Sequence, residues 1–151
     1  MNIKQPKEKH IPLLQALWKE AFGDTDAFLD TFFATAFATN RCRCLFINDA
    51  PVAMLYWFHC EYEGQPVAYL YAIATAASHR GQGLCKQLMQ NTHKHLERLG
   101  YQGALLVPGE NSLFSFYEQL GYKSTCYIKE FTCTGNPQDL RPRRISANEY
   151  A

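Results

Sequence analysis

Apolar residues repeat with helical spacing in four stretches of the chain. In the first stretch Leu14, Leu17 and Trp18 fall on one face of a helix, because residues three and four apart are neighbours on its surface. Gly23 and Gly100 follow the first and third stretches, where glycine commonly ends a helix. Helices are therefore predicted over 11–22, from a cap at Asp24 or Thr25 to about 37, over 84 to about 99, and over 113–120 after a cap at Asn111 or Ser112.

Between these helices, apolar and β-branched residues gather in short runs bounded by turn sequences. Residues 48–51 (Asn-Asp-Ala-Pro) and 64–66 (Gly-Gln-Pro) are such turns. Strands are predicted over 44–47, 52–59, 67–75 and 103–107, with one bent strand or two short ones over 122–134. This order of elements predicts an α+β (mixed α/β) fold, in which a central helix packs on a largely antiparallel sheet.

The length of 151 residues fits one ordinary domain, which we expect over residues 1–134. Residues 135–151 contain two prolines and three arginines but few core-type residues. They are predicted to form a C-terminal tail, or the start of a truncated extension.

Composition and charge exclude several classes of partner. The chain is 47% hydrophobic and 19% charged, which is typical of a compact globular domain. Its net charge of +1 gives no long-range field to select nucleic acid or an anionic membrane. No stretch approaches the ~20 apolar residues that span a bilayer, and residues 1–9 lack a signal-peptide pattern. We therefore expect a cytoplasmic protein without a nucleic-acid or membrane partner.

The six cysteines are expected to be free thiols in that reducing location. Cys42 and Cys44 alternate at strand spacing, which predicts that both point to one face of a strand. No Cys-x-x-Cys pair occurs, and the five histidines complete no ligand set by local spacing. The sequence therefore predicts no metal site.

Gly81-Gln82-Gly83 lies between a predicted strand and a predicted helix. The glycines leave backbone N–H groups open to a ligand, and the first turn of the helix adds unpaired donors and the positive end of its dipole. Arg80 adds a charged donor. The loop thus predicts an anion site suited to phosphate or pyrophosphate, although glycine pairs also occur in such turns for steric reasons alone.

Two motifs resemble those of a known family. Residues 80–85 (Arg-Gly-Gln-Gly-Leu-Cys) resemble the Arg/Gln-x-x-Gly-x-Gly/Ala signature of the GNAT superfamily of N-acetyltransferases, and residues 73–75 sit where that family has its preceding strand end. Residues 111–122 (Asn-x-x-Phe-x-x-Tyr-x-x-x-Gly-Tyr) resemble the second signature, in which an Asn precedes Tyr-x-x-x-Gly-Phe/Tyr. The order of elements agrees as well, and the resemblance covers roughly residues 1–133.

The resemblance implies a single GNAT-like domain with a mostly antiparallel, six- to seven-stranded central sheet and helices on both faces. It implies acetyl-CoA as co-substrate and no metal. The pyrophosphate would lie on the glycine loop. The pantetheine arm would pair with the strand at 73–75, which splays from the strand at 103–107. The implied binding residues are Ile73, Ala74, Thr75, Arg80, Gly81, Gln82, Gly83, Leu84, Cys85, Asn111 and Tyr117.

The implied reaction is transfer of an acetyl group from acetyl-CoA to a primary amine, by direct attack in a ternary complex. The acceptor is an unidentified small molecule or peptide, and a homodimer is compatible with this interpretation. Tyr117 is the candidate acid for the leaving thiolate, and its alternative is an aromatic core position. Glu110 is the candidate base, and its alternative is a solvated loop residue.

Two residues depart from the family pattern, in which Gly or Ala stands at Cys85 and Ala at Phe114. The Cys85 backbone would still bind phosphate, and the alternative is a reactive thiol at a helix N-terminus. The bulkier Phe114 would either change the shape of the site at the pantetheine end of the cofactor or pack in the hydrophobic core. These departures leave open a non-catalytic acyl-CoA-binding or regulatory module, and the aromatic helix near 28–37 leaves open an interaction domain.

Aromatic residues of the second helix and the middle strands are candidates for an apolar acceptor cleft or, alternatively, for core. They are Phe28, Phe32, Phe33, Tyr56, Trp57 and Tyr62. No acidic cluster accompanies them to indicate a polycationic acceptor.

Overall fold

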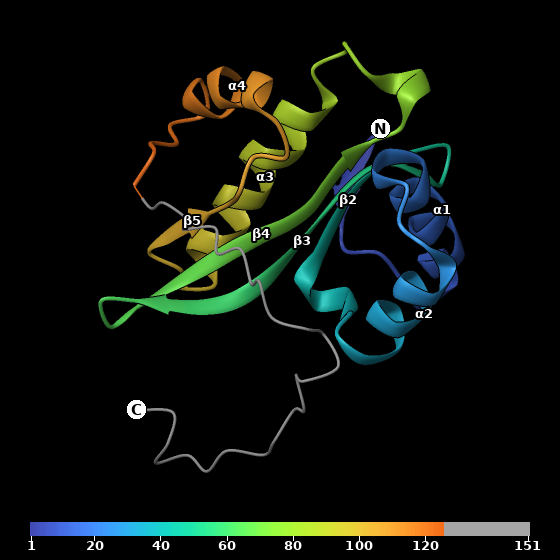
Figure 1. The fold of residues 1–151 in the computed structure, drawn as a ribbon, viewed down its shortest axis with the longest axis horizontal. Helices are drawn as coiled ribbons and strands as arrows, with labels where there is room; N and C mark the ends of the chain where they lie inside the picture. Colours follow the sequence, from blue (N-terminus) through green and yellow to red (C-terminus); the bar gives the residue numbers. More distant parts are fainter. Residues whose placement is uncertain (126–151) are drawn as a thin grey trace, which may run out of the picture.

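A mixed five-stranded sheet forms the centre of the protein in the computed structural model, which describes residues 1–125 (Figure 1). The strand order is β1-β2-β3-β4-β5, with antiparallel pairing up to β4 and β5 parallel to β4. The strands are Asn2–Lys4 (β1), Cys42–Ile47 (β2), Ala50–Tyr62 (β3), Gln65–Thr75 (β4) and Gly103–Leu105 (β5). The predicted α+β class and largely antiparallel sheet are confirmed.

The strand count differs from the expected six or seven. β1 was not anticipated, because three residues are too short to carry a period-two pattern. Residues 122–125 form no strand, so the strand predicted over 122–134 is wrong at its start. Its remainder and the predicted tail at 135–151 lie outside the described residues.

Helices cover both faces of the sheet, as predicted (Figure 1). Helices α1 and α2 lie on one face, and α3 and α4 lie on the other. The α-helices are Ile11–Phe22 (α1), Asp26–Thr35 (α2), Leu84–Arg98 (α3) and Phe114–Glu118 (α4), and the 3-10 turns are Glu8–His10, Thr39–Arg41, Ala77–His79 and Asn111–Leu113.

Each face of the sheet has its own hydrophobic core. Leu55, Trp57 and Leu70 pack with Leu88 and Met89 of α3 in one core. The other core, against α1 and α2, contains Trp18, Phe32, Tyr56 and both Cys42 and Cys44. The two thiols are buried, with their Sγ atoms 3.7 Å apart, so the predicted shared face is confirmed. The strands separate the two sets because successive side chains point to opposite faces.

The ends of α1 and α2 follow the predicted signals. Gly23 closes α1 with φ 72°, in the left-handed region. Thr25 caps α2, since its Oγ1 accepts the Phe28 N–H at 3.3 Å. This frees the other predicted cap, Asp24, for a different contact.

The start of α4 corrects a prediction. Asn111 and Ser112 do not cap it, because they form a 3-10 turn in which the Leu113 N–H donates to the Glu110 carbonyl at 3.1 Å. Leu113 is the residue before the helix, and it makes no side-chain cap. The tight turn shortens α4 to five residues.

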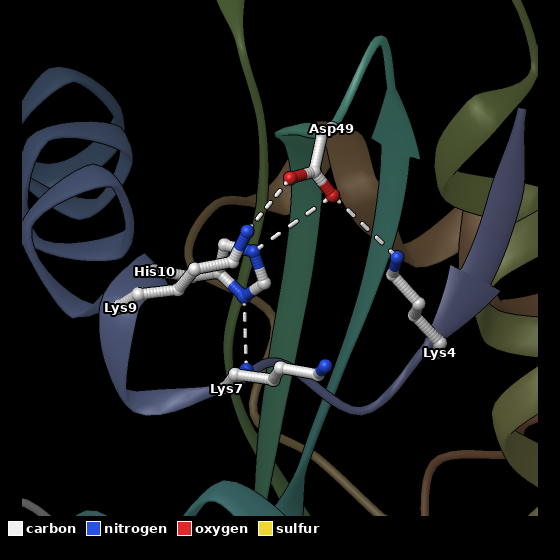
Figure 2. A network of polar contacts seen from close by, with 5 residues as sticks. All are labelled: Lys4, Lys7, Lys9, His10 and Asp49. Atoms are coloured by element: carbon white, nitrogen blue, oxygen red, sulfur yellow. Dashed lines mark hydrogen bonds and ion pairs between the residues drawn. The ribbon is translucent and has the colours of Figure 1, made fainter.

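The two-residue turn between β2 and β3 is tied to the N-terminal segment (Figure 2). Asn48 and Asp49 both have positive φ, of 50° and 61°, so β3 starts at once with Ala50. The Asp49 carboxylate lies 2.9 Å from Lys9 Nζ and 3.6 Å from Lys4 Nζ. Burial lowers the pKa of the adjacent His10, whose Nδ1 accepts the Lys7 N–H at 2.9 Å.

A bulge interrupts β4 near its end. Tyr71 pairs with Tyr56 and Ala74 with Met54, so Ala72 and Ile73 together oppose the single residue Leu55. Ala72 takes a positive φ of 50°. The extra residue keeps Tyr71 and Ala72 against α1 and α2, while Ile73 faces α3.

The pairing of β4 with β5 is short. It runs only over Val67–Gly103, Ala68–Ala104 and Tyr69–Leu105. All three residues of β5 take part in this pairing, and within residues 1–125 the rest of the outer edge of β4 has no neighbouring strand.

Candidate active site

A cleft of ≈ 310 Å³ opens where β4 ends and α3 begins. Its walls come from the end of β4, the following loop, the first turn of α3 and one side chain of α4. The lining residues are Thr75, His79, Arg80, Gly81, Gly83, Leu84, Cys85, Lys86 and Phe116. The loop predicted to bind an anion therefore borders a cleft.

The glycines of the loop adopt a conformation that other residues rarely take. Gly81 and Gly83 have φ values of 73° and 72°, and a Cβ added at either would meet no atom within 4 Å. Gly83 is the N-cap residue of α3 and supplies no side-chain cap. The first N–H groups of a 15-residue helix therefore point into open space with the positive end of its dipole. Helix N-termini with these features are suited to binding anions.

Two cationic side chains border the same cleft. The Arg80 Nε donates to the Thr75 carbonyl at 3.1 Å, which holds the guanidinium against the end of β4. Lys86 is exposed and lies in the first turn of α3, which contains no acidic residue. A cation there is unfavourable for the helix dipole unless an anion is bound nearby.

Three cleft residues were missed in the sequence: His79, Lys86 and Phe116. Lys86 is exposed on α3, and its place beside the cleft depends on the tertiary structure. Its position in the first turn of a helix without an acidic residue was the available signal. The His79 Nδ1 lies 2.9 Å from the Ser78 Oγ, and nothing in the local sequence indicated this contact.

Other predicted residues lie beside the cleft rather than in its wall. Gln82 turns back to the Ser78 carbonyl, at 3.5 Å, and braces the loop. Ile73 packs on the core under α3, and Ala74 is buried on the opposite face. Asn111 is exposed in its 3-10 turn and is absent from the lining. Glu110 is exposed too.

Tyr117 lies beside Cys85, under the cleft. It is only 8% exposed and packs in the core under α3, with its ring centroid 5.2 Å from Phe116 and 5.8 Å from Tyr122. Burial raises the pKa of Tyr117 to about 12, with a smaller contribution from Cys85. Phe114 is 41% exposed, so the suggestion that it fills core is wrong, and Phe116 is the phenylalanine that borders the cleft.

The Cys85 thiol is not activated by its position at the start of α3. Burial raises its pKa from 9.0 to about 11, and the facing Thr75 hydroxyl offsets this only in part. The Thr75 Oγ1 is itself buried without a well-formed hydrogen bond. Desolvation of the buried sulfur is therefore the main influence on the pKa of this thiol.

Alkylation of Cys85 should accordingly be slow. A pKa of about 11 in place of 9.0 leaves about 100-fold less thiolate at pH 7.5. We expect iodoacetamide to modify Cys85 at least tenfold more slowly than a cysteine in an unfolded peptide, as measured by mass spectrometry of the digested protein. A rate equal to that of the peptide would restore the interpretation as a reactive thiol.

A comparison with known families agrees with this geometry. The family model of the acetyltransferase (GNAT) domain matches residues 2–125. The chain belongs to the GNAT family. No curated protein matches it.

Solved structures share the GNAT fold at low sequence identity. An acetyltransferase from Agrobacterium tumefaciens is 16% identical, with a TM-score of 0.71, and the match covers 88% of this chain and 100% of that one. A protein from Clostridium acetobutylicum, solved with acetyl-CoA, is 18% identical with a TM-score of 0.69, covering 87% and 95%. AAC(6')-Iy, solved with the bisubstrate analogue CoA-S-monomethyl-acetylneamine, is 17% identical with a TM-score of 0.70, covering 89% and 98%.

Membership of the GNAT family supports acyltransfer in general and leaves the acceptor undefined. Among residues 1–125, no helix of this GNAT domain is long and apolar enough to cross a membrane.

Proposed function

We propose that this GNAT domain transfers an acetyl group from acetyl-CoA to a primary amine in a ternary complex. The observation that carries the proposal is the cleft at the start of α3, where glycine N–H groups meet two cations. The pyrophosphate would accept hydrogen bonds from the N–H groups of Gly81, Gly83, Leu84 and Cys85. Arg80 and Lys86 would balance its charge.

The pantetheine arm would lie along the outer edge of β4, where β5 no longer pairs. Within residues 1–125 no strand pairs with that part of the edge, and an extended chain can bind to such an edge as an added strand. At the bulge, Ala72 and Ile73 oppose one residue of β3, so one residue there has no regular partner and its backbone N–H could point elsewhere. This N–H would donate to the thioester oxygen as it becomes an oxyanion.

Bond changes in the transfer are then simple. The acceptor's ammonium group first loses one proton and becomes the neutral amine. The amine nitrogen then forms a bond to the acetyl carbon while the C–S bond breaks, the nitrogen releases a second proton to water, and the departing thiolate takes up one proton from water. We propose that Glu110, at the turn after β5, accepts the amine proton through water.

Tyr117 would stabilise the leaving sulfur. With a pKa raised to about 12, its hydroxyl stays protonated at neutral pH. A thiolate whose conjugate acid has a pKa of ~8.5 is too weak a base to remove that proton completely. Tyr117 would therefore act as an acid mainly by donating a hydrogen bond to the sulfur as the C–S bond breaks.

Lys86 should contribute to coenzyme binding. We expect Lys86→Ala to weaken acetyl-CoA binding about tenfold, since a charge-assisted hydrogen bond to phosphate contributes about 1.5–3 kcal/mol. Calorimetry at low and high salt measures this, and the variant should lose part of the salt dependence. Lys94→Ala is the matched control, because Lys94 is an exposed lysine of the same helix outside the cleft. Equal affinities of the two variants would contradict the assignment.

The proposed function is tested by calorimetry with acetyl-CoA, followed by a thiol-release assay over a panel of primary amines. We expect micromolar binding, and release of CoA that depends on the added amine. Tight acetyl-CoA binding without release above the hydrolysis rate for every amine would reject transfer. The non-catalytic acyl-CoA-binding module would then remain.

A further inference from the structure

The connection between α1 and α2 brings one carboxylate to the sheet face opposite the core under α3. The Asp24 Oδ2 accepts a hydrogen bond from the Trp18 Nε1 at 2.8 Å, and the residue is half-buried. The end of α1 is also fastened to the loop after β4, because the Ala77 N–H donates to the Glu20 Oε1 at 2.9 Å. Asp24 is therefore held in a fixed position relative to β4.

Asp24 lies next to Tyr71, the residue before the β4 bulge. Burial is the main cause of the raised pKa of Tyr71, and the negative charge of Asp24 is the next cause. Trp18 joins them, with its ring centroid 5.6 Å from that of Tyr71. The carboxylate thus lies near the segment where the thioester is expected.

No cation balances this carboxylate within residues 1–125. The neighbouring Lys19 Nζ lies 2.6 Å from the Asp26 Oδ1, and the ion pairs of this part of the chain do not include Asp24. A half-buried carboxylate with one hydrogen bond and no counter-charge has lost hydration without full compensation. A bound ammonium group would supply the missing charge.

Aromatic rings surround the same position. Trp18 lies 6.1 Å from Phe28 and 6.0 Å from Phe33, and Tyr71 lies 5.6 Å from Phe58 between centroids. Phe28 is 41% exposed, so this aromatic wall extends to the surface. Ring faces attract an ammonium group and remove an apolar substituent from water.

We propose that Asp24 binds the ammonium group of the acceptor, and that the acceptor is a singly charged primary amine with an aromatic or branched apolar substituent. This inference rests on the proposed acetyl transfer. Asp24 is half-buried, whereas the neighbouring carboxylates Glu20 and Asp26 are exposed and bind the Ala77 N–H and Lys19, so Asp24 matches one positive charge. The aromatic wall matches an apolar group better than a sugar or a polyamine.

Substrate preference tests the proposal on the unmodified protein. In the thiol-release assay we expect kcat/KM for 2-phenylethylamine to exceed that for ethanolamine and for spermidine by at least about tenfold, because covering an apolar substituent adds ~0.8 kcal/mol per buried methylene. The isosteric alcohol 2-phenylethanol should compete at least tenfold more weakly than the amine. Equal rates with the three amines, or equal competition by the alcohol, would overturn it.

Asp24→Asn tests the residue itself. The amide oxygen can still accept from Trp18, so we expect the fold to persist. We expect KM for 2-phenylethylamine to rise about 30-fold, with kcat and the acetyl-CoA Kd changed less than threefold. Asp26→Asn is the matched control, a carboxylate two residues away that pairs with exposed Lys19, and it should leave all three unchanged. An unchanged KM in Asp24→Asn, or an equal rise in Asp26→Asn, would overturn the proposal.

Binding without turnover separates this inference from the proposed function. Trp18 contacts Asp24 directly, so its fluorescence reports a ligand there. Titration with 2-phenylethylamine should change the emission in the unmodified protein and not in Asp24→Asn. This signal without any CoA release would reject acetyl transfer and keep the amine site. If CoA were released at the same rate by Asp24→Asn and by the unmodified protein, the amine site would be rejected and acetyl transfer would be kept.

Discussion

Tyr117→Phe is expected to lower kcat about 100-fold while leaving the acetyl-CoA affinity within twofold. Phenylalanine preserves the ring that packs in the core under α3 and removes only the hydroxyl that would face the leaving sulfur. Because the change keeps the buried ring and its packing, the free energy of unfolding of the variant should change little. Steady-state kinetics and calorimetry on the same preparations measure both quantities.

Tyr122→Phe is the control for this change. Tyr122 is a half-buried tyrosine whose ring contacts Tyr117, but its hydroxyl lies 2.7 Å from the His93 Nε2. Its removal should change kcat less than threefold. An equal loss in both variants would show that packing, and not the Tyr117 hydroxyl, limits the rate.

The pH dependence gives an independent check of the same residue. Because burial raises the pKa of Tyr117 to about 12, the unmodified protein should not lose kcat between about pH 8 and pH 10 through its ionisation. A decline in that interval that disappears in Tyr117→Phe would mean that the hydroxyl ionises near its ordinary pKa.

Gly83→Val is expected to weaken acetyl-CoA binding by about 100-fold or more. The residue has φ 72°, a conformation that costs a residue with a Cβ about 1–2 kcal/mol, and a β-branched side chain adds to this. No protein atom lies within 4 Å of the added Cβ, so the domain should still fold. The new side chain would stand in the loop where the pyrophosphate must approach the N–H groups.

Gly100→Val separates strain from binding. Gly100 follows the other end of α3, has φ 90° and also meets nothing within 4 Å of an added Cβ. We expect Gly100→Val to lower Tm by about as much as Gly83→Val does. The acetyl-CoA Kd of Gly100→Val should be unchanged. Comparable losses of affinity in both variants would mean that backbone strain in α3, not access to the loop, explains the result.

Local patterns were sufficient to predict the elements that carry most of the fold. The α1 prediction of 11–22 matches the structure because its apolar stripe and Gly23 both act within the helix. The turn at 111–113 could not be predicted in the same way. Asn111 and Ser112 have the chemistry of helix caps, but the chain makes a 3-10 turn there, and that choice depends on how α4 packs.

The sequence predicted only those residues of the candidate site that are contiguous in the chain. Arg80 to Cys85 were found because one loop contains all the backbone donors. Lys86 was missed because its role depends on the opening of the cleft beside it. Asp24 was considered only as a helix cap, since neither the hydrogen bond from Trp18 nor the approach of Tyr71 has a signal in local spacing.

The division of the hydrophobic interior into two cores has a consequence for how such a domain can change over time. The cleft at the start of α3, where we propose that acetyl-CoA binds, borders the core under α3, whereas the aromatic wall belongs to the core under α1 and α2. Substitutions in the aromatic wall can alter one layer while the other keeps its packing, because the effects of distant sites add independently. Substitutions under α1 and α2 could therefore adapt the domain to a new amine, while the layer under α3, which is proposed to bind acetyl-CoA, keeps its packing.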